Sequence, residues 1–333
     1  MARLENQTLD RRTAAESAKR RFEPSYLQLL GSGALAERAR LAREHLADCD
    51  LCARYCHVNR LETTRGAICR TGAQAVVASF APHHGEEDCL RGRRGSGTIF
   101  FSWCNLRCVF CQNWETSWKG QGDEVGDEGL AEIMLRLQAL GCHNINFVSP
   151  SQVVAQILAA LVIAAERGLR LPLVYNTGGY DSPEALALLD GAIDIYMPDM
   201  KYGGSEPAHK HSHIRNYLRH NQAAVREMHR QVGDLVLDQE GIARRGLLVR
   251  HLVLPGDIAG TEVVVRFLAE EISPDTYLNL MDQYRPCFKA AQFPELDRGI
   301  TSAEYQEALE LARRYGLTRL DHRAAIGGFA QVL

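Results

Sequence analysis

Apolar residues recur along most of the chain in two alternating patterns, one typical of amphipathic helices and one typical of buried strands. Between residues 127 and 140, an apolar side chain returns every three or four positions, which predicts a helix with one buried face. The run 98–103 is instead short, apolar, and β-branched or aromatic, which predicts a buried strand. Units of this kind, repeated along the chain, predict parallel βα units joined by right-handed crossovers.

Six strands and their helices can be located in this way. The predicted strands cover 98–103, 144–148, 171–175, 193–197, 246–254 and 277–281. The predicted helices cover 34–47, 127–140, 149–168, a segment opening at 182, 214–228, 261–271 and 301–315. Ser149 followed by Pro150 predicts an N-capped helix start, and Thr301 with Glu304 predicts a capping box. The segments 235–237 and 246–254 flank a turn and predict a hairpin.

This order of elements predicts an α/β fold whose six parallel strands form a partial, open (β/α)6 barrel. We expect an N-terminal helical lead-in and a small Cys-rich metal-binding module over residues 1–90. The partial barrel would then cover 91–320, and a C-terminal tail would cover 321–333.

Composition narrows the class of protein further. The chain has 333 residues, of which 46% are hydrophobic, and this is enough to form a sizeable core. Its net charge of -3 indicates no bulk attraction to nucleic acid or to a membrane. No apolar run approaches the roughly 18 residues of a membrane span, and the first 30 residues lack the hydrophobic core of a signal peptide. We therefore expect a cytoplasmic protein.

The candidate chemistry begins with three cysteines that follow the first predicted strand. Cys104, Cys108 and Cys111 lie within eight residues, and thiolates select zinc, copper(I) or iron–sulfur clusters over hard cations. A structural zinc takes four protein ligands, whereas three cysteines leave one metal position open. Since active sites of α/β barrels lie at the carboxyl ends of strands, the open position predicts a catalytic centre.

A second group of cysteines precedes the predicted barrel. It consists of Cys49, Cys52, Cys56 and Cys69, spaced C-x2-C-x3-C-x12-C. Four thiolates can complete a structural zinc site, or they can hold an auxiliary [4Fe–4S] cluster. The spacing alone does not separate these two interpretations. Clustered cysteines of this kind suit a reducing compartment better than a disulfide framework.

The first cysteine group carries a resemblance to a known family. Its C-x3-C-x2-C spacing, with Phe110 before the last cysteine, resembles the signature of the radical S-adenosylmethionine (radical SAM) superfamily. The segments GSGTIFFSWCNLRCVFCQNWETS, LVYNTGGY, DIYMPDMKY and LMDQYRP resemble more narrowly the pyruvate formate-lyase activating-enzyme-like group, and the likeness runs from about residue 47 to 320. The resemblance implies a radical SAM partial barrel, a [4Fe–4S] cluster on the three cysteines, and S-adenosylmethionine as cosubstrate.

The resemblance also implies an activity. A radical SAM oxidoreductase takes one electron from a reductant such as flavodoxin or ferredoxin, cleaves S-adenosylmethionine, and abstracts hydrogen from its substrate. In the narrower group that substrate would be a glycine of a partner glycyl-radical enzyme, and the alternative is a small molecule or a peptide. The opposing class is a non-catalytic zinc or iron–sulfur protein, in binding or electron transfer, whose two cysteine groups are both structural.

Finally, the resemblance implies which residues contact S-adenosylmethionine. By position in the family pattern these are Phe110, Ser149, Asn176, Thr177, Asp199, Lys201 and Arg250. Ser149 stands where the family usually has a glycine-rich motif with a glutamate, and this chain has neither feature there. A polar residue at the end of a strand can also merely cap a neighbouring helix, so a structural role is the alternative for each of them.

Overall fold

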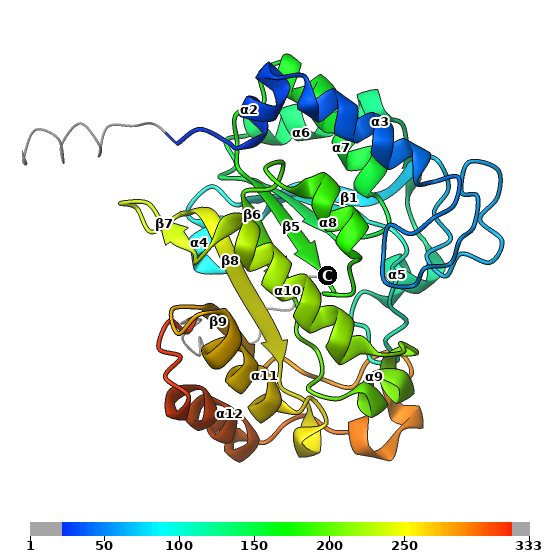
Figure 1. Cartoon of the computed structure of the whole chain (residues 1–333). Helices are drawn as coiled ribbons and strands as arrows, with labels where there is room; N and C mark the ends of the chain where they lie inside the picture. Colours follow the sequence, from blue (N-terminus) through cyan, green and yellow to red (C-terminus); the bar gives the residue numbers. More distant parts are fainter. Residues whose placement is uncertain (1–21, 322–333) are drawn as a thin grey trace, which may run out of the picture.

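A computed structural model describes residues 22–321, and its centre is a mixed β-sheet with helices along its outer face (Figure 1). Six strands of this sheet are parallel to their neighbours, and they follow the chain in order. They are β2 (Ser96–Phe101), β4 (Ile145–Val148), β5 (Leu173–Thr177), β6 (Ile195–Pro198), β8 (Ala243–Leu252) and β9 (Tyr277–Met281). The predicted α/β fold with six parallel strands is confirmed.

Helices separate the parallel strands and bury one face each against the sheet. The main ones are α6 (Asp127–Ala139), α7 (Val154–Glu166), α8 (Pro183–Leu189), α10 (Tyr217–Val232), α11 (Thr261–Phe267) and α12 (Ser302–Arg314). Strands and helices together enclose one large core of fully buried aliphatic and aromatic side chains. Two N-terminal helices, α2 (Tyr26–Gly31) and α3 (Ala34–Glu44), pack on α7 and extend this core outward (Figure 1).

Three antiparallel strands extend the parallel set. β1 (Ala75–His83) pairs with β2 on one side and with β3 (Asp123–Val125) on the other. β7 (Val236–Leu237) pairs with β8 and forms the predicted hairpin. β1 and β3 were not predicted, and β1 joins the sheet although it lies within residues 1–90.

Several predicted helix boundaries need correction. The helix predicted from Ser149 begins five residues later, at Val154, and Ser149 has a left-handed φ of 58° instead of capping it. The physical reason lies in Gln152, whose side-chain amide donates to the carbonyls of Ser102 (3.3 Å) and Trp103 (3.2 Å) and so keeps the segment out of the helix. The helix predicted over 261–271 is α-helical only as far as Phe267, and the residues after it, Leu268–Ile272, form a π-helical turn.

Other boundaries agree with the sequence pattern. The capping box of α12 is present, with the Thr301 hydroxyl accepting from the Glu304 amide and the Glu304 carboxylate accepting from the Thr301 amide. The helix predicted over 214–228 differs, since it runs over Tyr217–Val232, and a separate helix, α9 (Ser205–Ser212), precedes it. Two shorter helices, α4 (Asp88–Arg91) and α5 (Trp114–Lys119), flank β2. The predicted lead-in up to residue 21 and the tail after residue 321 lie outside the described residues.

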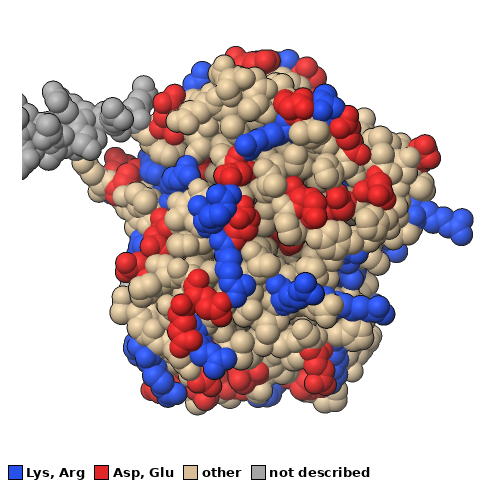
Figure 2. Space-filling view, viewed as in Figure 1, with Lys and Arg blue, Asp and Glu red and all other residues tan. Residues whose placement is uncertain are grey.

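The face of the molecule seen in Figure 2 is mixed in charge. Lys and Arg are interspersed with Asp and Glu over the face in Figure 2. Among residues 22–321, no helix combines the length and the apolar character that crossing a bilayer requires.

Candidate functional site

The three cysteines of the first group lie on the loop between β2 and α5, and all of them line one cavity at the carboxyl end of the parallel strands. Each sulfur has at least one hydrogen bond with a neighbouring group. The Leu106 amide donates to Cys104 Sγ at 3.3 Å, and the Ser212 hydroxyl donates to Cys108 Sγ at 3.0 Å. Cys111 Sγ lies 3.1 Å from Ser117 Oγ. Donors aimed at sulfur stabilise a thiolate or a cluster sulfur and tune its electronics.

Backbone contacts from distant segments hold this cysteine loop in place. The amides of Arg107 and Val109 donate to the carbonyls of Ser212 (3.2 Å) and His211 (2.8 Å) at the end of α9. From the N-terminal side, Arg54 Nε donates to the Asn105 carbonyl at 2.7 Å. The loop is therefore fixed by elements on both sides of it in the sequence.

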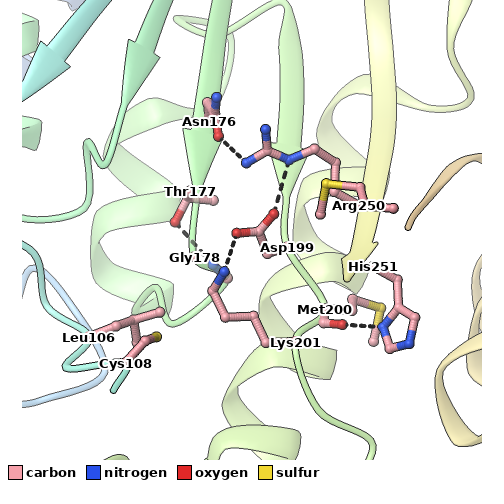
Figure 3. A network of polar contacts seen from close by, with 12 residues as sticks. Leu106, Cys108, Asn176, Thr177, Gly178, Asp199, Met200, Lys201, Arg250 and His251 are labelled. Atoms are coloured by element: carbon pink, nitrogen blue, oxygen red, sulfur yellow. Dashed lines mark hydrogen bonds and ion pairs between the residues drawn. The ribbon is translucent and has the colours of Figure 1, made fainter. Parts of the chain in front are cut away.

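The strand ends opposite the loop carry a continuous chain of polar contacts (Figure 3). Asn176 at the end of β5 accepts from Arg250 Nη2 at 2.6 Å, and Arg250 Nε donates to Asp199 Oδ1 at 2.9 Å. Lys201 Nζ donates to the other Asp199 oxygen at 2.6 Å. These contacts link β5, the segment after β6, and β8, so three strands position one charged group of side chains.

The electrostatics of this group follow from burial and pairing. Burial alone would raise the pKa of the Asp199 carboxyl, but Arg250 and Lys201 outweigh it and hold that pKa below its usual range. For Lys201, burial lowers the pKa, yet Asp199 and Cys108 outweigh this and raise it above its ordinary value. All three groups are therefore charged at neutral pH. Two cations against one carboxylate leave this side of the cavity with a net charge of about +1.

The thiols on the other side of the cavity have the opposite tendency. Burial raises the pKa of the Cys104 thiol to about 12, and it also raises the pKa of Cys108 against the lowering effect of Lys201. These thiols keep their protons until a metal takes the thiolate, and metal binding therefore releases protons.

The cavity fits an incompletely ligated cluster. Its lining contains the three thiols as soft ligands, and among the described residues that line it there is no further cysteine and no histidine. The one carboxylate there, Asp199, already has both oxygens engaged by Arg250 and Lys201. Cys104, Cys108 and Cys111 would hold a [4Fe–4S] cluster and leave its fourth iron to a ligand that is not part of the chain.

The predicted contact residues do not all occupy the same kind of position. Ser149, Asn176, Thr177, Asp199, Lys201 and Arg250 line the cavity. The Thr177 hydroxyl, however, donates to the buried Asp181 carboxylate at 2.7 Å. This contact is structural, which is the alternative to cosubstrate binding for a residue at the end of a strand. Phe110 does not line the cavity, since its ring packs edge-on against Tyr202 and Tyr284 in a neighbouring apolar cluster.

Three residues at or beside the cavity were not predicted from the sequence, and of these Ser117 lines it. Ser212 and Ser117 contact the sulfurs of Cys108 and Cys111, and both are buried. Tyr217 accepts from the Lys201 amide at 2.9 Å, and so anchors the segment after β6. Ser117 had a weak signal, being six residues after Cys111, whereas Ser212 and Tyr217 come from α9 and α10, more than 100 residues beyond the cysteines.

The second cysteine group lies beside the first. Cys49, Cys52 and Cys69 are buried and Cys56 is half-buried, and all of them are free thiols. Arg107 of the cysteine loop connects the two groups: its guanidinium donates to the Ile68 carbonyl and is close enough to Cys69 and Cys104 for electrostatic interaction.

Comparison with known proteins gives a family match over the segment that builds this site. The model of the Radical SAM superfamily matches residues 98–256. An uncharacterized protein of Methanocaldococcus jannaschii is 30% identical to the chain over 303 residues, which is 89% of this chain and 83% of that protein.

Two methyltransferases are among the solved structures that the chain matches. One is a radical SAM methyltransferase from Sphaerobacter thermophilus, 14% identical, with a TM-score of 0.44 over 66% of this chain and 64% of that one. Another is the radical S-adenosylmethionine methyltransferase TsrM from Kitasatospora setae, 13% identical, with a TM-score of 0.47 over 67% of this chain and 52% of that one. The chain thus spans less than two thirds of either methyltransferase.

Proposed function

The chain belongs to the radical SAM superfamily. From that premise we propose that it is an enzyme that binds a [4Fe–4S] cluster through Cys104, Cys108 and Cys111 and cleaves S-adenosylmethionine reductively. The observation that carries this proposal is the shared cavity. The three thiols face strand-end residues that are charged and already ordered by one another. When bound, the cluster supplies the electron that breaks a C–S bond of the sulfonium, giving methionine and a 5′-deoxyadenosyl radical.

The residues of the chain have distinct tasks in this proposal. Lys201 and Arg250 give the cavity a positive side that attracts the cosubstrate carboxylate. Asp199 holds both cations in place, and Asn176 fixes the far end of the Arg250 guanidinium. Because these groups are paired before the cosubstrate arrives, little ordering cost remains to be met on binding.

The substrate that loses hydrogen is the finer part of the proposal. The resemblance to activating enzymes favours a backbone glycine of a partner glycyl-radical enzyme, with flavodoxin or ferredoxin as reductant. A small molecule or a peptide is the alternative substrate class. Both share the same first step, so the cleavage of S-adenosylmethionine is tested before either.

The test is anaerobic reconstitution of the protein with iron and sulfide, followed by reduction with dithionite and measurement of 5′-deoxyadenosine. Wild type should produce it, and Cys108→Ala should fall to background because one cluster ligand is lost. Cys142→Ala is the matched control, since Cys142 is a buried free thiol outside both cysteine groups. Cleavage by Cys108→Ala at the wild-type rate would overturn the proposal.

The narrower assignment needs a separate measurement. The reduced, cluster-loaded protein is mixed with S-adenosylmethionine and a glycyl-radical enzyme, and the glycyl radical is sought by electron paramagnetic resonance. A signal that depends on Cys108 supports the activating-enzyme substrate. Production of 5′-deoxyadenosine without any glycyl radical favours the small-molecule or peptide class.

A further inference from the structure

Four cysteines lie between residues 49 and 69 of the N-terminal module, and a buried arginine, Arg60, contacts one of them. Cys56 Sγ donates to the Cys49 carbonyl at 3.8 Å, and Cys52 is close enough to Cys49 and Cys69 for electrostatic interaction. The guanidinium of Arg60 interacts with Cys49, Cys52 and Cys69. The four cysteines therefore lie near one another in one part of the module.

The backbone of this module is constrained although it contains no helix or strand between residues 45 and 74. The Cys49 amide donates to the Val58 carbonyl at 3.2 Å, and the His57 amide donates back to the Cys49 carbonyl at 3.0 Å. Tyr55 and His57 have left-handed φ values of 44° and 52°, which side chains other than glycine rarely adopt. A short segment with this backbone requires a strong local interaction to keep it folded.

Arg60 shows that this interaction involves negative charge. Its side chain is only 2% exposed. Within residues 22–321, its hydrogen bonds go to the carbonyls of Thr71 (2.7 Å), Gly72 (3.4 Å) and Gln152 (2.6 Å) and to Cys49 Sγ (3.4 Å), with no carboxylate among them. A buried cation without an anionic partner costs several kcal/mol. The surrounding sulfurs can supply the missing negative charge at this position once a bound metal cluster has displaced their protons.

We propose that Cys49, Cys52, Cys56 and Cys69 bind a second [4Fe–4S] cluster, and that Arg60 balances part of its negative charge. A zinc ion requires its sulfurs within about 2.3 Å of one point. Among residues 22–321, no three His, Cys, Asp or Glu side chains are arranged to hold a single ion. A cluster accommodates more widely spaced sulfurs because each binds a different iron.

The loading step balances without a redox partner. A preassembled cluster exchanges its external ligands for the four cysteines, so four Sγ–Fe bonds form and the four thiol protons pass to solvent. No electron is transferred in this exchange. The second cluster would complete the coordination of all its irons with protein sulfur, in contrast to the cluster at Cys104, Cys108 and Cys111.

The position of the second site follows from Arg107. This residue belongs to the first cysteine loop, donates to the Ile68 carbonyl next to Cys69, and stacks over Trp118 at 5.0 Å. The second cluster would therefore lie directly behind the loop that holds the first one. Its loss should loosen that loop, so metal content has to be measured independently of enzyme activity.

The test counts iron and sulfide after anaerobic reconstitution, with Mössbauer spectra to identify the cluster type. Wild type should bind about eight irons and the variant Cys104→Ala/Cys108→Ala/Cys111→Ala about four. The variant Cys52→Ala/Cys69→Ala should also bind about four, whereas Cys89→Ala, which removes a buried thiol outside both groups, should keep about eight. The triple variant isolates the second site, so its result does not depend on the proposed cleavage of S-adenosylmethionine.

Two outcomes would overturn the proposal. One is a triple variant that binds zinc and no iron, and the other is a Cys52→Ala/Cys69→Ala variant that keeps the wild-type iron content.

Substitution of Arg60 provides a readout that leaves all four thiols in place. Arg60→Met should lower the reduction potential of the cluster in the triple-variant background, because a positive charge next to it is lost, and Arg60→Lys should restore most of the shift. If the reduction potential of the cluster were unchanged in Arg60→Met, Arg60 would not balance the charge of the cluster.

Discussion

At the scale of single residues, Arg250 contributes most to the order of the cavity. Its planar guanidinium bridges two strands, with one nitrogen on Asp199 and another on Asn176. Burial would lower its pKa, but the Asp199 carboxylate outweighs this and raises it. A planar fork can make both contacts at once, whereas an ammonium group concentrates its donors at one point.

We predict that Arg250→Lys weakens S-adenosylmethionine binding about ten-fold, because the loss of one charge-assisted hydrogen bond costs about 1.5 kcal/mol. Equilibrium dialysis of the cosubstrate against the anaerobically loaded protein measures the effect. Arg244→Lys is the matched control, since Arg244 pairs with Asp238 in the hairpin before β8, outside the cavity. Equal affinities for the two variants would contradict a binding role for Arg250.

Two side chains of the site, Asp199 and Ser212, differ in how well the sequence predicted them. Asp199 was predicted from the resemblance to the activating enzymes, by its position at the end of the fourth strand, and the carboxyl ends of parallel strands meet at one edge of the sheet. Ser212 was not predicted, although its hydroxyl lies 3.0 Å from Cys108 Sγ. A serine in a His-rich helix has no local signal for this role, because the contact arises only when α9 packs against the cysteine loop.

At the scale of elements, the segment after β5 shows how the strand ends are held. Gly179 has a φ of 72°, and the Asn221 side chain of α10 donates both to its carbonyl at 3.0 Å and to the Asp199 carbonyl at 2.9 Å. A Cβ atom at Gly179 would lie 2.3 Å from the Asp199 carbonyl oxygen and 2.2 Å from Asn221 Nδ2. The close approach of these backbones therefore requires glycine.

We predict that Gly179→Ala lowers the free energy of unfolding by about 2 kcal/mol, through overpacking and an unfavourable φ. Urea denaturation at neutral pH measures this change. Gly299→Ala is the control, because the nearest atom to a Cβ there is an ordinary contact at 3.9 Å. If both variants unfolded at the same urea concentration, Asn221 and the Asp199 carbonyl could move aside for a Cβ atom at Gly179, and the prediction would be wrong.

The sequence pattern predicted the parallel strands better than the antiparallel ones. β9 has the predicted bounds, and its three central residues are buried. β3 contains two acidic residues and is a strand only because it pairs with β1. α9 includes Pro207 and several polar residues, so its helical propensity is low and its formation depends on packing. Tertiary context decides such elements.

At the scale of the whole molecule, one buried carboxylate connects the beginning of the described chain to the middle of the sheet. Asp194 Oδ1 accepts from the amide and the hydroxyl of Ser25, both at 2.9 Å, and Oδ2 accepts from the Leu173 amide at 3.1 Å. Arg245 Nη1 in turn donates to the Ser25 hydroxyl at 2.6 Å. The residues are far apart in sequence, so this contact contributes to the overall stability of the fold.

The Asp194 carboxyl makes that stability depend on pH. Burial raises its pKa from 3.8 to about 6, even though the hydrogen bonds from Ser25 and Leu173 lower it. The folded state therefore holds this proton more tightly than the unfolded state does. The associated stability is fully present below pH 3.8 and is lost as the pH rises through about 6. A shift of about two pKa units corresponds to about 3 kcal/mol.

We predict that Asp194→Asn removes this dependence, because an amide does not ionise in that pH range. The free energy of unfolding of wild type minus that of the variant should fall by about 2.5 kcal/mol between pH 4 and pH 8. Urea denaturation across that range measures it, and Asp275→Asn, at an exposed position, gives the baseline for removing a surface carboxylate. The prediction would fail if this difference stayed constant with pH or grew in favour of wild type as the pH rose. The Asp194 carboxyl would then be ionised throughout the range, and Ser25 and Leu173 would stabilise its charge more than burial opposes it.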